Sequence, residues 1–137
     1  MLRRIFLIAL AVSLAACARE PAGPESAPAV TFRFVHTTHD ERFVARTSDP
    51  DLIARVRAEL AKPLAERALH INGVIAKGSD ANAPWSWHFV EKEWTLAEMS
   101  IELCDGWPGY IEENLDTWLA DVGFFCPWAS KVEIELQ

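Results

Sequence analysis

The sequence predicts an α+β domain, in which an antiparallel-rich sheet of five or six strands carries two helices on one face. Three observations support this prediction. Residues 131–136 alternate apolar and polar side chains, as half-buried strands do. Two longer segments, residues 48–60 and 105–123, repeat apolar residues at helical spacing instead. The first two strand-like runs flank a short polar turn, which favours antiparallel pairing.

The first predicted elements are a hairpin and a helix. Residues 30–35 and 42–47 are rich in β-branched and aromatic side chains and form the hairpin. A helix follows, because Ser48 or Asp49 can cap its N-terminus and Pro50 suits its first turn. Its apolar residues share one face: Leu52, Ile53, Val56 and Leu60.

The middle of the chain predicts further strands. A third strand is expected over residues 69–77, interrupted at Asn72 and Gly73, and a loop over residues 78–84. Residues 85–90 predict the next strand. Residues 95–104 also alternate, which predicts a half-buried strand that ends at Cys104.

The second helix is expected within residues 105–123. Pro108 suits an early helical position, and Gly123 suits the C-cap. The predicted apolar stripe is Ile111, Leu115, Trp118, Leu119 and Val122. Residues 131–136 form the last strand.

The N-terminus has the form of an export signal. Arg3 and Arg4 precede an apolar run that is shorter than the roughly 20 residues a membrane span needs. Residues 14–17, Leu-Ala-Ala-Cys, resemble the lipobox of bacterial lipoproteins. Residues 1–16 are therefore expected to be a lipoprotein signal peptide, with Cys17 as the lipid attachment point. Plain secretion with a chance cysteine is the alternative.

A tether and a single domain are expected after the signal. Residues 17–29 are rich in Pro, Ala, Gly and Ser, and would reach at most about 40 Å when extended. Residues 30–137 have the length of one domain. We therefore expect a protein anchored through Cys17 in the bacterial cell envelope, on the periplasmic side or at the outer membrane. Ala18 stands where inner-membrane retention would call for Asp.

The chain is acidic. It has 13 basic and 20 acidic residues, and removal of Arg3 and Arg4 changes its formal charge from −7 to −9. Residues 93–130 contain eight acids and neither Lys nor Arg. Such a surface repels phosphate backbones, so a nucleic acid is not expected as a partner. Two interpretations of the acidic residues remain open. They could form a solvated face, or they could bind a basic partner.

Two cysteines remain once Cys17 carries lipid. Cys104 and Cys126 would meet in an oxidising compartment, which favours a disulfide. A redox pair lacks the C-x-x-C spacing, and two thiolates are too few for structural zinc.

Several residues are candidates for a functional site. His36 and His39 have metal-ligand spacing, although solvated turn residues are the alternative. Another candidate is His88, which could act as a general acid or base, or could be a structural histidine. Four tryptophans could contact a ligand or belong to the core: Trp85, Trp87, Trp107 and Trp128. Trp107 and Trp128 are the stronger ligand candidates, because Gly- and Pro-rich loops carry them.

Six motifs occur in order along residues 43–134: FVARTSDPDLIARVRAEL, HINGVIAKG, APWSWHF, IELCDG, YIEENLD and FCPWASKV. Together they resemble the N-terminal domain of the amoebal calmodulin-binding protein family, which also occurs as small exported bacterial proteins. The resemblance implies one α+β domain and a bond between Cys104 and Cys126. It implies no catalytic residues, and calmodulin binding is not carried over, since no basic amphipathic helix is present.

These observations predict a lipid-anchored binding module rather than an enzyme. Its expected partners are the membrane, through Cys17, and a protein, peptide or small ligand, and no cofactor is expected. Two alternatives stay open. One is a small hydrolase or lyase that uses His88 with a nearby carboxylate. The other is a protease inhibitor that presents residues 78–84 or the loop after Cys104.

Overall fold

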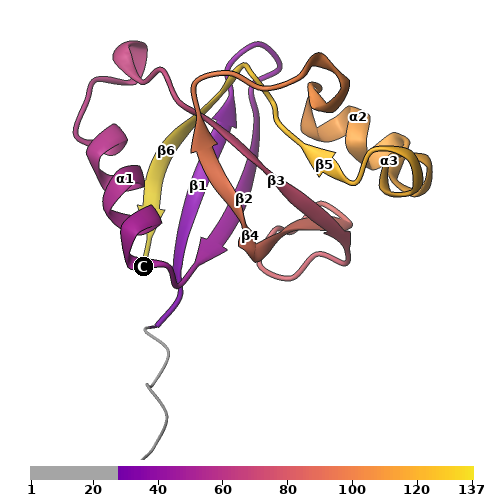
Figure 1. Ribbon diagram of the computed structural model, residues 1–137, viewed down its shortest axis with the longest axis horizontal. Helices are drawn as coiled ribbons and strands as arrows, with labels where there is room; N and C mark the ends of the chain where they lie inside the picture. The colour runs from indigo at the N-terminus through magenta and orange to yellow at the C-terminus, as the bar shows by residue number, and fades with distance from the viewer. Residues whose placement is uncertain (1–27) are drawn as a thin grey trace, which may run out of the picture.

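The strands form two antiparallel three-stranded sheets (Figure 1). The computed structural model describes residues 28–137. The first sheet has the order β2-β1-β6, with β1 at Val30–His36, β2 at Glu41–Thr47 and β6 at Ser130–Leu136. The second has the order β4-β3-β5, with β3 at His70–Lys77, β4 at Trp87–Ala97 and β5 at Phe124–Phe125. The predicted α+β class is confirmed, and the five or six strands expected are six, divided between two sheets rather than joined in one.

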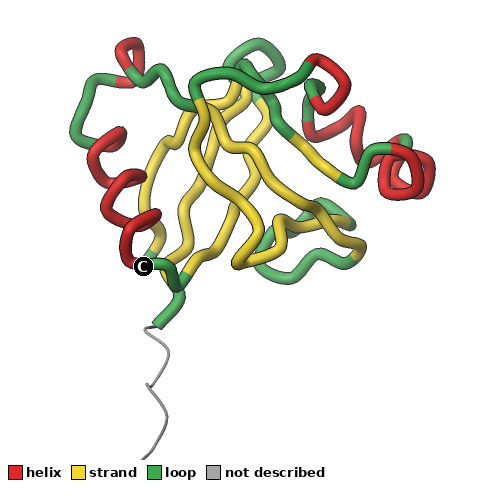
Figure 2. The backbone as a smooth tube through the Cα atoms, in the orientation of Figure 1, coloured by secondary structure: helices red, strands yellow, loops and turns green. Residues whose placement is uncertain are grey.

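The helices flank the strands on two sides (Figure 2). The α-helices are α1 at Pro50–Leu60, α2 at Pro108–Glu113 and α3 at Leu115–Asp121, and short 3₁₀ turns lie at Leu64–Glu66 (η1) and Glu102–Cys104 (η2). Helix α1 packs beside β6, whereas α2 contacts β2 and α3 contacts β3. None of the helices in the described part of the chain has the length and apolar character that a bilayer crossing requires.

Helix α1 begins where its sequence predicts. The Asp49 side chain caps it by accepting hydrogen bonds from the backbone N–H groups of Asp51 and Leu52. Pro50 occupies its first position, where the missing N–H costs nothing. Its predicted apolar face is buried at Leu52, Ile53 and Val56.

Aromatic side chains form the core between the two sheets. Phe34 of β1 meets Trp94 of β4 edge to face, with ring centroids 5.9 Å apart. Phe43 of β2 contacts Trp87, Phe89 and Phe125 from the other sheet. This geometry is the favourable one for aromatic pairs and fixes how the sheets face each other.

Residues 95–104 do not form the predicted separate strand. Strand β4 continues without a break from Trp87 to Ala97, and its pairing with β3 ends at the partners Ala97 and His70. Beyond Ala97 the chain has no strand to pair with, and Cys104 is reached through η2 instead. The apolar half of the alternating pattern is therefore exposed rather than buried.

The predicted second helix is two helices. Asn114 separates α2 from α3 with φ −121° and ψ 19°. Its side-chain amide donates to the Tyr110 carbonyl at 2.9 Å, and such local bonds compete with regular helix geometry. Gly123 ends α3 as predicted, with φ +70° and its N–H bonded to the Trp118 carbonyl.

The predicted interruption of β3 is a register shift. The strand is continuous, but its pairing with β4 shifts between Gly73 and Ile75. Gly73 lies so close to β4 that an added Cβ would be 2.3 Å from the Cβ of Trp94. Glycine is required there by close approach of two strands.

Side chains close both edges of the first sheet. At the β2 edge, the Arg42 carbonyl accepts from Trp85 Nε1 at 2.7 Å, the Val44 N–H donates to Asn82 Oδ1 at 2.7 Å and the Arg46 carbonyl accepts from Trp94 Nε1 at 2.7 Å.

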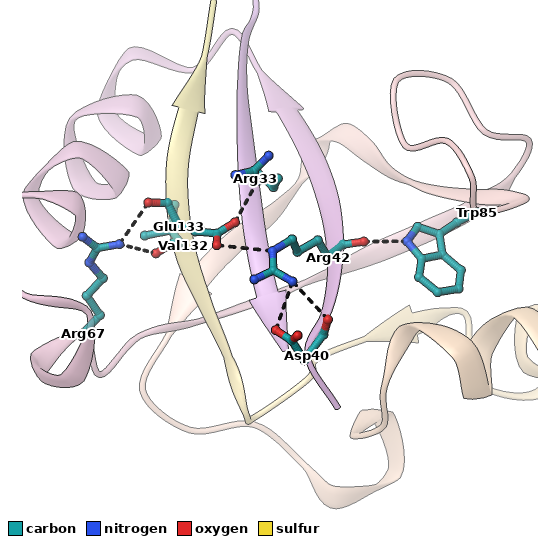
Figure 3. A network of polar contacts seen from close by, with 7 residues as sticks. All are labelled: Arg33, Asp40, Arg42, Arg67, Trp85, Val132 and Glu133. Atoms are coloured by element: carbon teal, nitrogen blue, oxygen red, sulfur yellow. Dashed lines mark hydrogen bonds and ion pairs between the residues drawn. The ribbon is translucent and has the colours of Figure 1, made fainter. Parts of the chain in front are cut away.

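At the β6 edge, Arg67 donates to the Val132 carbonyl at 2.6 Å (Figure 3). Glu133, beside Val132, accepts from Arg33 at 2.7 Å and from Arg42 at 3.3 Å. Unpaired backbone groups on edge strands are a risk for aggregation, and the bonds to the backbone from Trp85, Asn82, Trp94 and Arg67 occupy several of these groups on both edges.

Candidate functional site

Three loops meet at the end of the sheets opposite the start of β1 (Figure 1). They are the β1–β2 turn, the loop from η2 to α2 and the loop from β5 to β6. The Cys104–Cys126 disulfide joins the last two, and the Cys126 N–H also donates to the Cys104 carbonyl at 2.8 Å. The predicted disulfide is confirmed, and it fixes two of the three loops relative to each other.

A cleft of about 420 Å³ opens between these loops, and we call it the histidine cleft. Its lining combines two histidines, two acids and two tryptophans with small residues: His36, Thr38, His39, Glu102, Asp105, Gly106, Trp107, Trp128 and Ala129. The structure thus brings together two pairs of residues that were predicted as separate candidate sites, His36 with His39 and Trp107 with Trp128.

His36 ends β1 and is buried. Its Nδ1 accepts a hydrogen bond from the His39 N–H at 3.3 Å. Burial is the main factor that lowers the pKa of His36, and the neighbouring His39 lowers it further. Asp105, Glu41 and a hydrogen bond with the Gly106 backbone oppose this shift. His36 is therefore a neutral imidazole near pH 7.

The two loop tryptophans differ in how much of each ring is free. Trp107 stacks on His39 with ring centroids 4.3 Å apart, and its ring also meets Tyr110 at 5.1 Å. Trp128 is 47% exposed, and its backbone N–H donates to Asp105 Oδ1 at 2.9 Å. Within residues 28–137, no aromatic ring pairs with Trp128. Trp128 is therefore the more exposed of the two loop tryptophans.

A second cleft, of about 270 Å³, is also lined by Trp128. We call it the serine cleft, and its lining is Ala68, His70, Glu98, Met99, Ser100 and Trp128. His70 Nε2 lies 2.7 Å from Ser100 Oγ, which also accepts from Asn72 Nδ2 at 3.0 Å. Burial lowers the pKa of His70, while Asp105 opposes the shift.

Sequence reasoning missed His70 and Ser100. His70 begins β3, and Ser100 lies in the segment that was predicted to be a strand. His70 begins the family motif HINGVIAKG, but the motif assigns it no role, and Ser100 lies in none of the six motifs. Only the polar character of His70 at the start of an apolar strand could have indicated a special environment.

The three other predicted residues lie away from both clefts. Trp87 is fully buried in the core, and the Trp85 indole N–H donates a hydrogen bond to the Arg42 carbonyl. His88 Nδ1 lies 2.6 Å from the Gly78 carbonyl. Among residues 28–137, no carboxylate forms a hydrogen bond or ion pair with His88.

The histidine pair has no further metal ligand in position. Within residues 28–137, no group of three or more His, Cys, Asp or Glu side chains is arranged to hold a metal ion. His39 instead stacks on Trp107, which occupies one face of its ring. Cys17 and the predicted signal peptide lie outside the described residues, as does nearly all of the tether.

Comparison with known proteins gives one family. No curated protein and no solved structure matched the chain. A family model described as the BP-74 N-terminal domain matches residues 28–137, which include the whole folded domain. This match confirms the family that the six sequence motifs indicated. The chain therefore belongs to the BP-74 N-terminal domain family.

Proposed function

We propose that this protein is an exported, lipid-anchored binding module of the bacterial envelope, and that it is not an enzyme. It binds a protein, peptide or small ligand through the two clefts that flank Trp128. The anchor is a lipid on Cys17, followed by the tether of residues 17–29.

The observation that carries this proposal is the position of Trp128. Trp128 lines both the histidine cleft and the serine cleft. Its backbone is fixed by Asp105, and the disulfide at Cys126 lies two residues away. A partly exposed indole on a fixed backbone, shared by two polar clefts, is the kind of anchor that dominates binding energy at interfaces.

The direction of β1 supports the same proposal. The strand begins at Val30, beside the expected tether, and ends at His36 in the histidine cleft (Figure 1). A chain anchored at Cys17 would therefore present the clefts on the end of the domain that is farthest from its attachment.

Neither alternative finds comparable support. A hydrolase or lyase would need an acid beside His88 in a cleft, whereas the ring of His88 meets a backbone carbonyl. A protease inhibitor would present an exposed loop to the protease. Most of residues 78–84 are exposed, but they line neither of the two clefts, and the loop after Cys104 is held by the stacking of Trp107 on His39.

Site-specific crosslinking tests the binding site. A photo-crosslinking amino acid replaces Trp128 in cells that produce the lipidated protein, and the matched control carries it at Lys92, an exposed position on β4. The proposal expects a crosslinked species from position 128 that is absent from position 92. Equal crosslinking from both positions, or none from position 128, would overturn it.

Membrane fractionation tests the anchor separately. Cys17→Ser should move the protein from the membrane fraction to the soluble envelope fraction and remove the mass of the attached lipid. A variant that still fractionates with membranes would show that Cys17 is not the anchor.

A further inference from the structure

Four apolar side chains stand exposed beside the disulfide, and we call them the apolar ridge. Their exposed fractions are 87% for Met99, 68% for Ile101, 67% for Leu103 and 48% for Phe124. Three of them belong to the segment that was predicted to be a half-buried strand. Clustered exposed apolar residues on a small domain indicate an interaction surface.

The ridge borders a depression with apolar walls. A cleft of about 380 Å³ is lined by Ile101, Leu103, Val122 and Phe124, and no charged side chain lines it. Cys104 forms part of its floor, so the disulfide supports it. The cleft also shares Ser100 with the serine cleft, which places the ridge next to the Trp128 site.

The charges around the ridge restrict what can cover it. Acids line the adjoining clefts: Glu98, Glu102, Asp105 and Asp121. Among residues 28–137, no Lys or Arg lines these three clefts or the apolar one. In residues 28–137, no basic side chain forms an ion pair with Glu98, Glu102 or Asp121. The ridge is therefore apolar in its centre and negatively charged at its rim.

The charge around the apolar ridge distinguishes between the molecules that could bind it. A second copy of the chain would bring the same acids to the contact, and like charges oppose that pairing. An anionic lipid surface would be repelled in the same way. A polypeptide with basic residues beside an apolar face matches both the centre and the rim.

We propose that the apolar ridge binds an amphipathic polypeptide segment that carries Lys or Arg residues beside its apolar face. This inference rests on the proposed function, because it names the chemical class of partner that the binding module takes. Leu103 and Ile101 supply the apolar contact, and Glu98 and Glu102 pair with the basic residues.

Peptide titration tests the proposal. The exported chain with Cys17→Ser is titrated with a fluorescent helical peptide of about 18 residues, made of Leu and Lys in an amphipathic pattern. The matched peptide replaces every Lys by Glu. The proposal expects the Lys peptide to bind at least about tenfold more tightly, with an affinity that falls as salt rises. Equal affinity for the two peptides would overturn it.

Variants of exposed residues locate the contact. Ile101→Ser with Leu103→Ser should weaken binding at least about tenfold, and Glu98→Lys with Glu102→Lys should do the same by reversing the rim. Leu64→Ser is the matched control, because Leu64 is exposed on η1 and lines neither the ridge nor the clefts beside it. If the control weakened binding as much as the ridge variants, the location would be wrong.

Vesicles provide the last discriminating measurement. The proposal expects no binding to vesicles of an anionic phospholipid, and binding that the ridge variants abolish would overturn it in favour of a lipid surface. The outcome is separable from the Trp128 test. A crosslink at position 128 without peptide binding would leave the proposed function standing and remove only this inference.

Discussion

The imidazole ring of His39 lies parallel to the indole of Trp107, with centroids 4.3 Å apart and planes inclined by 6°. The contact joins the β1–β2 turn to the residue that precedes α2. A second bond strengthens this junction, since the Gly109 N–H donates to Glu41 Oε2 at 2.8 Å. The stacking also covers Trp107, so the two loop tryptophans have different roles.

Alanine substitutions should separate these roles. Trp107→Ala removes a packed ring and should lower the free energy of unfolding by about 2 kcal/mol or more. Trp128→Ala removes an exposed ring and should change it by less than about 0.5 kcal/mol. Urea unfolding followed by circular dichroism measures both values, and similar losses for the two variants would contradict the assignment.

Gly73→Ala should destabilise the second sheet. The new Cβ would lie 2.3 Å from Trp94 Cβ and 2.7 Å from the Glu93 carbonyl oxygen, so the strands must separate. We expect a loss of about 3 kcal/mol in the free energy of unfolding. Gly106→Ala is the control, because its Cβ would meet nothing closer than 3.6 Å. If both variants unfold at the same urea concentration, the predicted clash between the added Cβ and β4 is wrong.

Asn82→Ala should weaken the β2 edge. Asn82 is buried, accepts from the Val44 N–H at 2.7 Å and donates to the Trp87 carbonyl at 2.8 Å. Its removal leaves two backbone groups without partners and should cost about 2–4 kcal/mol. Hydrogen exchange at Val44 should accelerate as well. Asn114→Ala, an exposed change, should leave exchange at Val44 unaltered.

Loss of the disulfide should destabilise the domain and loosen the cleft. The bond joins cysteines 22 positions apart, and closing such a loop contributes about 3 kcal/mol in the chain-entropy model. Cys104→Ala with Cys126→Ala should therefore lower the free energy of unfolding by about this amount. Reduction of the natural protein provides the matched measurement. If neither change alters the free energy of unfolding, the loops keep their positions without the disulfide.

The stability should fall as the pH drops below about 7. Burial lowers the pKa of His36 and of His70 below the ordinary value of 6.5. The unfolded chain then takes up protons that the folded chain resists, so stability is complete above 6.5 and declines below it. At its steepest, the free energy of unfolding should fall by about 1.4 kcal/mol per pH unit for each histidine.

Unfolding measurements between pH 7.5 and 5.5 test this dependence. His36→Asn with His70→Asn should flatten the slope even if it lowers the stability overall. A slope that survives both substitutions would assign the effect to other groups.

Local signals in the sequence were sufficient for several elements. Asp49 and Pro50 mark the start of α1, and Gly123 marks the end of α3, because caps depend on neighbouring backbone groups. The bond between Cys104 and Cys126 was also predictable, because the expected export of the chain leaves few other uses for an isolated pair of cysteines.

The errors concern contacts between distant residues. The apolar positions of residues 95–104 alternate as a strand does, but whether they are covered depends on the length of β3. The division into two sheets depends on strand pairing across the whole chain. Similarly, nothing near Trp107 in the sequence shows that His39 covers it.

The central position of β1 has a mechanical consequence. Force applied to residue 28 against a partner held at the clefts would act along the axis of this strand. Because β1 is bonded to β2 on one side and to β6 on the other, such a load would shear all of its backbone hydrogen bonds together rather than open them one after another. Pairing of β1 on both sides would thus make the domain resist unfolding under tension between residue 28 and the clefts.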